Sequence, residues 1–101
     1  MGKIYLIFNG AGQYKIGYTQ RDPEQRLMEL QTGNPETLMI IKTYKSSKAH
    51  EIEKILHRKY QIYKTQGEWF ELPPKEIPQF QENCALIESS LILLENNKIG
   101  L

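Results

Sequence analysis

The feature that most constrains the fold is a turn signal near the N-terminus, between two short runs of strand-forming residues. Residues 3–8 (KIYLIF) and 13–18 (QYKIGY) are rich in β-branched and aromatic side chains. The tetrapeptide NGAG at 9–12 separates them, and Asn-Gly is a strong hairpin signal. A phosphate-binding glycine loop would need a following Lys-Ser/Thr pair and a helix, which are missing here. The chain therefore begins with a predicted β-hairpin.

Helix and strand signals follow in alternation. Asp22 as N-cap and Pro23 at the first helical position predict a helix from Glu24 to about Gln31. A strand is predicted over 37–44, and a longer helix over 48–63 is capped by the serines at 46 and 47. Residues 67–72 (GEWFEL) form a short extended segment.

A last helix carries apolar residues at alternating three- and four-residue steps from Ile77 to Leu94. This seam can pack on the protein's own sheet, which we expect, or on a second copy of the chain. The sequence thus predicts an α/β fold with a small three-stranded, mainly antiparallel sheet flanked by helices. Residues 1–72 form the main body, and 73–101 form a C-terminal helix that covers the same single domain.

Length and composition restrict the setting. A chain of 101 residues, with 40% hydrophobic and 25% charged residues, is typical of one globular domain. It has no apolar run near the roughly 20 residues that cross a bilayer, and its first residues do not resemble a signal peptide. Cys84 is the only cysteine, so an internal disulfide and a cysteine-based zinc site are excluded. We expect a cytoplasmic protein.

Charge is divided unevenly along the chain. Residues 1–66 contain 11 Lys/Arg and 6 Asp/Glu, whereas 67–101 contain 2 Lys/Arg and 6 Asp/Glu. A basic front half indicates a phosphate-bearing partner, although an ordinary solvated surface would look the same. The candidate phosphate contacts, which would position nucleic acid without reading its sequence, are Lys42, Lys45, Lys54 and Arg58.

One acidic residue interrupts the apolar side of the second predicted helix. Apolar residues recur there at helical spacing from Ala49 to Tyr63, and Glu53 projects only about 40° from Ala49. A carboxylate at the edge of a buried stripe is costly unless it is paired, hydrogen-bonded or metal-bound. An ion pair with Arg26 or Lys15 would satisfy it, and so would a metal ion.

The order and spacing of several motifs resemble the GIY-YIG nuclease superfamily. The matching residues are Ile4-Tyr5, Lys15-Ile16-Gly17, Arg26, and Glu53 within the string IEKILH. The strings YKIGYT, LQTGNP, EKILH and GEWFEL are similar to a small branch found in phages, large DNA viruses and some cellular proteins. The resemblance covers residues 3–72, and the last helix is similar to that branch's C-terminal cover.

The resemblance implies hydrolysis of DNA by a metal-dependent endonuclease. Glu53 corresponds to the family's metal-binding carboxylate and would hold one divalent cation, Mg²⁺ or Mn²⁺, with no organic cofactor. Arg26 corresponds to the arginine that grips the scissile phosphate. Tyr5 corresponds to the tyrosine that orients or deprotonates the attacking water, although its ordinary pKa near 10 makes the second role depend on a nearby cation.

Each of these residues also has a structural interpretation. Tyr5 can be a packing residue of a strand, and Arg26 can pair with Asp22 four residues earlier in the chain. His57 lies four residues after Glu53, where it can be a second metal ligand, a proton shuttle or a histidine satisfied by its own packing.

The sequence departs from the family pattern at three places. Lys15 replaces the usual tyrosine of the second motif, and it can contact phosphate or lower the pKa of Tyr5. Leu30 replaces a His or Tyr of other branches and can neither donate nor accept a hydrogen bond. The asparagine that many members have near the site is absent, and the nearest residues are Glu68 and Trp69. We expect Trp69 to anchor its segment to the core rather than to stack on a base.

These departures predict weak cleavage and keep alternatives open. One alternative is a catalytically inactive DNA-binding module of the same fold. Another is a small dimerising protein, although we expect a monomer. A geometric condition is clear in advance: Tyr5 and Lys15 share a face only if the hairpin loop contains three or five residues.

Overall fold

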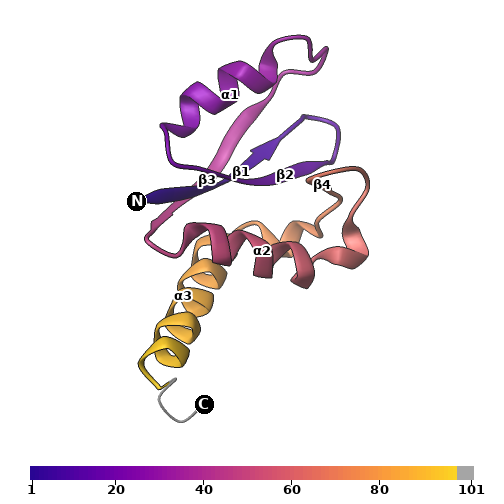
Figure 1. The fold of residues 1–101 in the computed structure, drawn as a ribbon. Helices are drawn as coiled ribbons and strands as arrows, with labels where there is room; N and C mark the ends of the chain where they lie inside the picture. The colour runs from indigo at the N-terminus through magenta and orange to yellow at the C-terminus, as the bar shows by residue number, and fades with distance from the viewer. Residues whose placement is uncertain (98–101) are drawn as a thin grey trace.

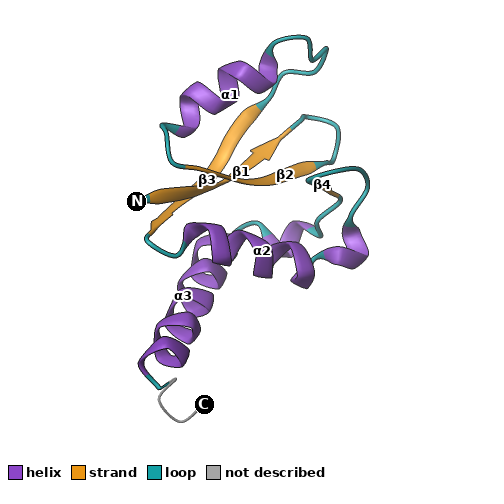
Figure 2. Ribbon diagram, in the orientation of Figure 1, coloured by secondary structure: helices purple, strands orange, loops and turns teal. Residues whose placement is uncertain are grey.

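The sheet has four strands within the described residues, one more than predicted. A computed structural model describes residues 1–97 and places the strands in the order β3-β1-β2-β4 (Figure 2). The strands are β1 (Gly2–Phe8), β2 (Tyr14–Thr19), β3 (Met39–Ser46) and β4 (Trp69–Phe70), and every neighbouring pair is antiparallel. The α/β class and the antiparallel sheet are confirmed. The predicted count of three strands is wrong because β4 has only two residues, too few to show strand alternation.

Helices cover both faces of the sheet. α1 (Pro23–Gln31) lies on one face, and α2 (Ala49–Lys59) and α3 (Phe80–Asn96) lie on the other (Figure 1). Alternate residues of β1 supply the two cores: Ile4 and Leu6 pack toward α2 and α3, whereas Tyr5 and Ile7 pack with residues of α1. The central strand is therefore buried on both sides.

The hairpin follows its local signals. Phe8 pairs with Tyr14, which leaves a five-residue loop. The Asn9 side-chain oxygen accepts the backbone N–H groups of Ala11 and Gln13 at 2.8 and 3.1 Å, and Gly10 has a φ of +76°. This loop length is one of the two that place Tyr5 and Lys15 on the same face, so that condition is met.

The predicted helix and strand ends are shifted where tertiary contacts intervene. The Asp22 cap is confirmed, because its side chain accepts the Glu24 N–H at 3.1 Å. β3 begins two residues later than predicted, since the Leu38 N–H donates to the Gln31 side chain of α1 instead of to the sheet. α2 ends at Lys59, and a 3₁₀ turn (Gln61–Tyr63) replaces its predicted last turn.

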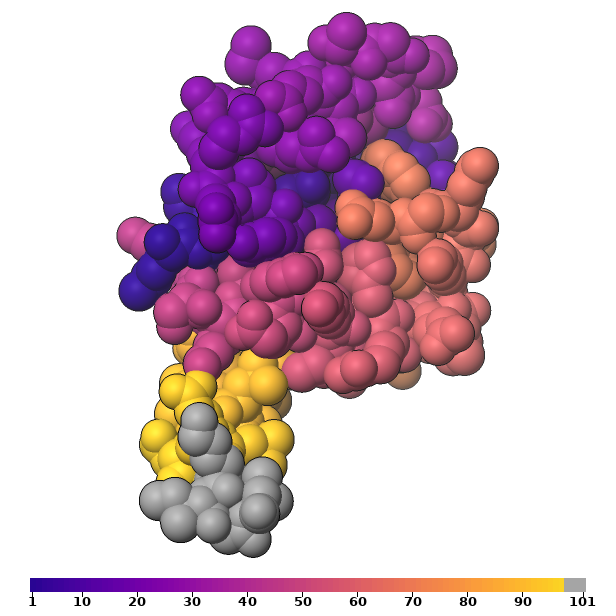
Figure 3. Space-filling view, viewed as in Figure 1, coloured from indigo at the N-terminus to yellow at the C-terminus, as the bar shows by residue number. Residues whose placement is uncertain are grey.

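The C-terminal helix packs on the body through its first half. A second 3₁₀ turn (Pro74–Glu76) precedes α3, in which Phe80 and Cys84 are fully buried. Leu93 and Leu94 are about two-thirds exposed, and Figure 3 shows the helix projecting from the body. The last four residues of the predicted 73–101 segment lie outside the described residues. None of the described helices is long and apolar enough to cross a membrane.

Candidate active site

Tyr5 lies across the glycine of the second motif. It is opposite Gly17 in the β1–β2 register, and it is only 2% exposed. A Cβ atom on Gly17 would lie 2.2 Å from both the Cζ atom and the hydroxyl oxygen of Tyr5, so a side chain there would collide with the ring. Gly17 therefore allows the phenol to cross β2 toward the outer edge of that strand.

Arg26 reaches the same tyrosine from α1. Burial raises the pKa of Tyr5, and a hydrogen bond from the Arg26 side chain opposes this increase without cancelling it. The phenol is therefore neutral near pH 7. Arg26 also donates to Glu29 at 3.2 Å, whereas Asp22 caps the helix instead of pairing with Arg26.

Lys15 is a nearly buried cation on the same face of β2. It is 8% exposed, and its Nζ atom lies 2.9 Å from the Glu68 carboxylate. The ammonium also lies 5.8 Å from the centre of the Trp69 ring, a distance compatible with a cation–π contact. Its charge is thus neutralised by Glu68, and the ion pair with Glu53 considered above does not form.

Glu53 is a half-buried carboxylate with no hydrogen-bond or ion-pair partner among the described residues. It lies on α2 next to the fully buried Ile52, as the helical spacing predicted. Within residues 1–97, no donor forms a hydrogen bond or ion pair with it. Burial raises the pKa of Glu53 and the negative charge of Glu68 raises it further, against the lowering effects of nearby His57, His50 and Lys15. These nearby groups offset the cost of burial only in part, and no hydrogen bond or ion pair within residues 1–97 adds to them.

His57 is held in one orientation by the edge of β2. Its Nε2 atom lies 2.8 Å from the carbonyl oxygen of Ile16, and its ring packs edge-on against Phe70 at 5.0 Å. A carbonyl can only accept, so Nε2 carries the proton in this contact. In the neutral imidazole, Nδ1 then keeps its lone pair and can accept a proton or bind a metal.

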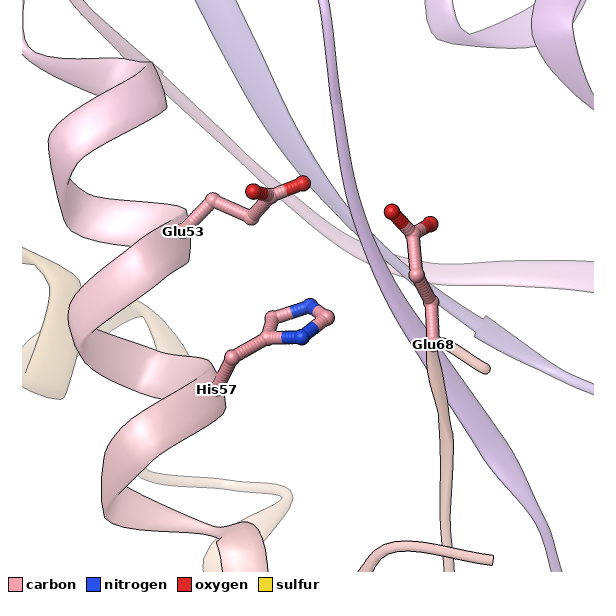
Figure 4. Close-up of side chains that lie close together, drawn as sticks. All are labelled: Glu53, His57 and Glu68. Atoms are coloured by element: carbon pink, nitrogen blue, oxygen red, sulfur yellow. The ribbon is translucent and has the colours of Figure 1, made fainter. Parts of the chain in front are cut away.

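Three side chains from two separate segments form a cluster suited to a cation. Glu53 and His57 project from α2 toward Glu68, which precedes β4 (Figure 4). Ligand atoms of the three residues lie within 4.8 Å of one another. Two carboxylates match the oxygen ligands that Mg²⁺ and Mn²⁺ prefer. Because no donor in the described part of the chain bonds to Glu53, these residues fit the cation that the family resemblance implies.

The predicted site residues come together from both faces of the sheet. Arg26 lies on α1 and Glu53 lies on α2, and these two helices cover opposite faces of the sheet (Figure 1). Tyr5 connects the two groups, because its pKa responds to the charges of Arg26, Glu53 and Glu68. The common location is the outer edge of β2, beginning at Lys15, which is one of the two β2 residues that pair with β4.

The predicted phosphate contacts are more dispersed. Lys42 and Lys45 lie on β3, which β1 separates from β2, and their odd spacing puts them on opposite faces of the sheet. Lys54 and Arg58 are exposed on α2, each one residue after a member of the cluster. Only this second pair lies on the helix that carries Glu53.

Sequence reasoning missed Glu68 as a candidate metal ligand. Glu68 occupies the region where the family pattern has an asparagine, and that coincidence was the available signal. Trp69 is half-buried against the core cluster that contains Tyr5, which supports the expected anchoring role. Leu30 packs in the same cluster, so its apolar side chain has a structural use.

Comparison with known proteins finds a family match over most of the chain. Residues 2–85, most of the chain, match the T5orf172 domain. No curated protein and no solved structure matches the chain significantly. The match spans the hairpin, both helices of the candidate site and β4. The chain therefore belongs to the T5orf172 domain family, a nuclease-associated family.

Proposed function

We propose that this protein is a DNA endonuclease that hydrolyses phosphodiester bonds with one divalent cation, Mg²⁺ or Mn²⁺. The observation that carries the proposal is the Glu53 carboxylate, half-buried and unpaired beside Glu68. Family membership and the resemblance to GIY-YIG nucleases support the same conclusion. A buried acid without a partner is retained at a cost, and metal binding is a function that accounts for it.

Glu53 would hold the cation, with Glu68 as a second oxygen ligand. Mg²⁺ usually binds through one or two carboxylates and keeps several waters. When bound, the cation supplies positive charge that stabilises the charge developing on the reacting phosphate. Lys15 contacts the Oε1 oxygen of Glu68, so the second carboxylate oxygen would be the one that binds the cation.

The remaining residues would bind the phosphate and move protons. Arg26 would donate two parallel hydrogen bonds to the non-bridging oxygens of the scissile phosphate. Tyr5, with its raised pKa, would remain a neutral phenol that orients the attacking water rather than deprotonating it. His57 would accept the water proton at Nδ1, because Nε2 donates to Ile16.

A catalytically inactive DNA-binding module is the second candidate. The Lys15–Glu68 ion pair favours this alternative. Lys15 replaces the tyrosine of the second motif and Glu68 is the proposed second metal ligand, and in this structure the two side chains bind each other. Such a protein would bind DNA through its basic residues in a salt-dependent manner. It would neither need a divalent cation nor cut the strand.

Plasmid nicking tests the proposal. Purified protein is incubated with supercoiled plasmid and Mg²⁺ or Mn²⁺, and wild type is compared with Glu53→Gln. We expect the substitution to reduce nicking at least 100-fold, the order of effect seen when a preorganised charge is removed. Glu51→Gln is the matched control, since Glu51 is an exposed acid on the same helix. Equal nicking by wild type and Glu53→Gln would reject the proposal, and no nicking by wild type would favour the binding module.

A further inference from the structure

We propose that a polar cavity beside the candidate active site binds one unstacked nucleobase of the substrate strand. The inference rests on the proposed function and adds a substrate class to it: DNA with an unpaired nucleotide next to the cleaved bond. The cavity lies where the hairpin loop, the loop after α1 and the segment before β4 meet at one end of the sheet (Figure 1). Its volume is about 340 Å³, within the usual range of small-molecule sites.

The lining of the cavity is rich in side-chain amides with free hydrogen-bonding atoms. Asn9 is fully engaged in the loop, because it bonds with Ala11, Gln13 and Glu36. The Asn34 oxygen accepts the Glu36 N–H, which leaves the Asn34 amide nitrogen available. Gln66 forms no side-chain hydrogen bond with any residue in 1–97. Amides donate and accept in one plane, as the edge of a base does.

Charge in the cavity favours a base over a phosphate. Among residues 1–97, no Lys or Arg lines the cavity, whereas Glu36 does, and its carboxylate would repel a phosphate. The lining also includes Trp69, whose indole is only partly buried: the buried part anchors the segment to the core, and the exposed part is a surface on which a base can stack. A neutral, planar, hydrogen-bonding ligand fits this combination.

The cavity is adjacent to the groups that would hold the scissile phosphate. Trp69 lies 5.8 Å from the Lys15 ammonium, and Lys15 contacts Glu68 of the candidate metal cluster. A phosphate bound near Lys15 would therefore carry its neighbouring base toward Trp69. That base must be unstacked to enter, which favours single-stranded or frayed DNA over an intact duplex.

Trp69 itself provides the test, because it is the only tryptophan of the chain. Its fluorescence is titrated in EDTA, where metal-dependent cleavage cannot occur, with a labelled single-stranded oligonucleotide. A second strand of equal length contains abasic sites throughout, so that it keeps every phosphate and loses every base. Anisotropy of the labels reports binding of each strand independently of Trp69.

We expect the normal strand to quench Trp69 and to bind about 5- to 100-fold more tightly than the abasic strand, as stacking contributes. Gln66→Ala should weaken binding of the normal strand about fivefold, whereas Gln61→Ala, outside the cavity, should not. Equal affinity and equal quenching for the two strands would overturn the inference alone. No binding of either strand would contradict the proposed function, and the inference with it.

Discussion

Two half-buried glutamates on the same side of the sheet, Glu88 and Glu53, differ in whether the fold provides them with hydrogen-bond donors. Glu88 of α3 accepts hydrogen bonds from the Tyr44 hydroxyl at 2.8 Å and from the Ser46 hydroxyl, and it fastens the helix to β3. Burial raises the pKa of Tyr44 to about 12, together with the hydrogen bond from its hydroxyl to Glu88. Glu53 of α2 is also half-buried, but no donor within residues 1–97 bonds to it. The comparison shows that the fold can satisfy a buried carboxylate, and that it does not do so at Glu53.

The difference separates a structural acid from a candidate functional one. A satisfied carboxylate stabilises its surroundings, so its removal should lower stability and leave chemistry unchanged. An unsatisfied carboxylate stabilises nothing, so its removal should abolish function and leave stability equal or higher. The predictions below test this separation, beginning with the largest expected effect.

The largest effect should come from Arg26, the residue proposed to bind the scissile phosphate. We expect Arg26→Lys to reduce plasmid nicking about 100-fold, because lysine cannot form the paired hydrogen bonds to phosphate. Arg21→Lys is the matched control, since Arg21 binds the same Glu29 at 2.8 Å and is exposed. Similar losses for both variants would mean that the Arg–Glu29 network, not phosphate contact, supports activity.

The Glu88 region should respond in stability rather than activity. We expect Glu88→Gln to lower the free energy of unfolding by about 1.5–3 kcal/mol, the contribution of hydrogen bonds to a charged group. Thermal or urea unfolding measures this change, and the nicking rate of the folded variant should match wild type. A variant of unchanged stability that loses nicking would reverse the assignment of the two acids.

Lys15 should limit metal binding, because it competes for Glu68. We expect Lys15→Met to tighten Mn²⁺ binding about two- to fivefold, as expected from losing an ion pair of modest strength. Isothermal titration calorimetry measures the affinity, and Lys59→Met serves as a control on the exposed side of α2. Unchanged or weaker Mn²⁺ binding would show that Glu68 pairs with Lys15 and does not contact the cation.

The smallest effect concerns the pH dependence of stability. The pKa of Glu53 is raised in the folded state, so the folded protein holds this proton to a higher pH than the unfolded chain does. Ionised Glu53 therefore lowers the stability of the folded protein. This loss develops as the pH rises from about 4.3, the pKa in the unfolded chain, through the folded pKa, and it persists at neutral pH. Glu53→Gln should raise Tm slightly at pH 7 and not below pH of about 4. A lower Tm at pH 7 would indicate a stabilising contact of Glu53.

Much of this fold is predictable because its signals are local. The NGAG turn and the Asp22-Pro23 cap act within a few residues, and both lie where the sequence puts them. The ends of β3 and α2 are shifted because Gln31 and the return of the chain to β4 compete with local preference. The fourth strand needs a partner distant in sequence, which no local pattern reveals.

The candidate site divides in the same way. Helical spacing alone places Glu53 at the edge of the buried stripe, and strand parity puts Tyr5 and Lys15 on one face. Glu68 was not predicted as a ligand, because only the folding of residues 60–70 back onto β2 brings it near α2. Local periodicity therefore identifies Glu53 as an unusual acid, whereas only the tertiary structure shows that Glu68 lies beside it.

Mn²⁺ binding, measured by calorimetry on wild type, Glu53→Gln and Glu88→Gln, tests the central claim most directly. Both substitutions remove one negative charge from a half-buried glutamate, so general electrostatics cannot distinguish them. We predict that wild type and Glu88→Gln bind the ion with the same affinity and that Glu53→Gln binds it at least tenfold more weakly. Equal affinity for all three proteins would contradict the account.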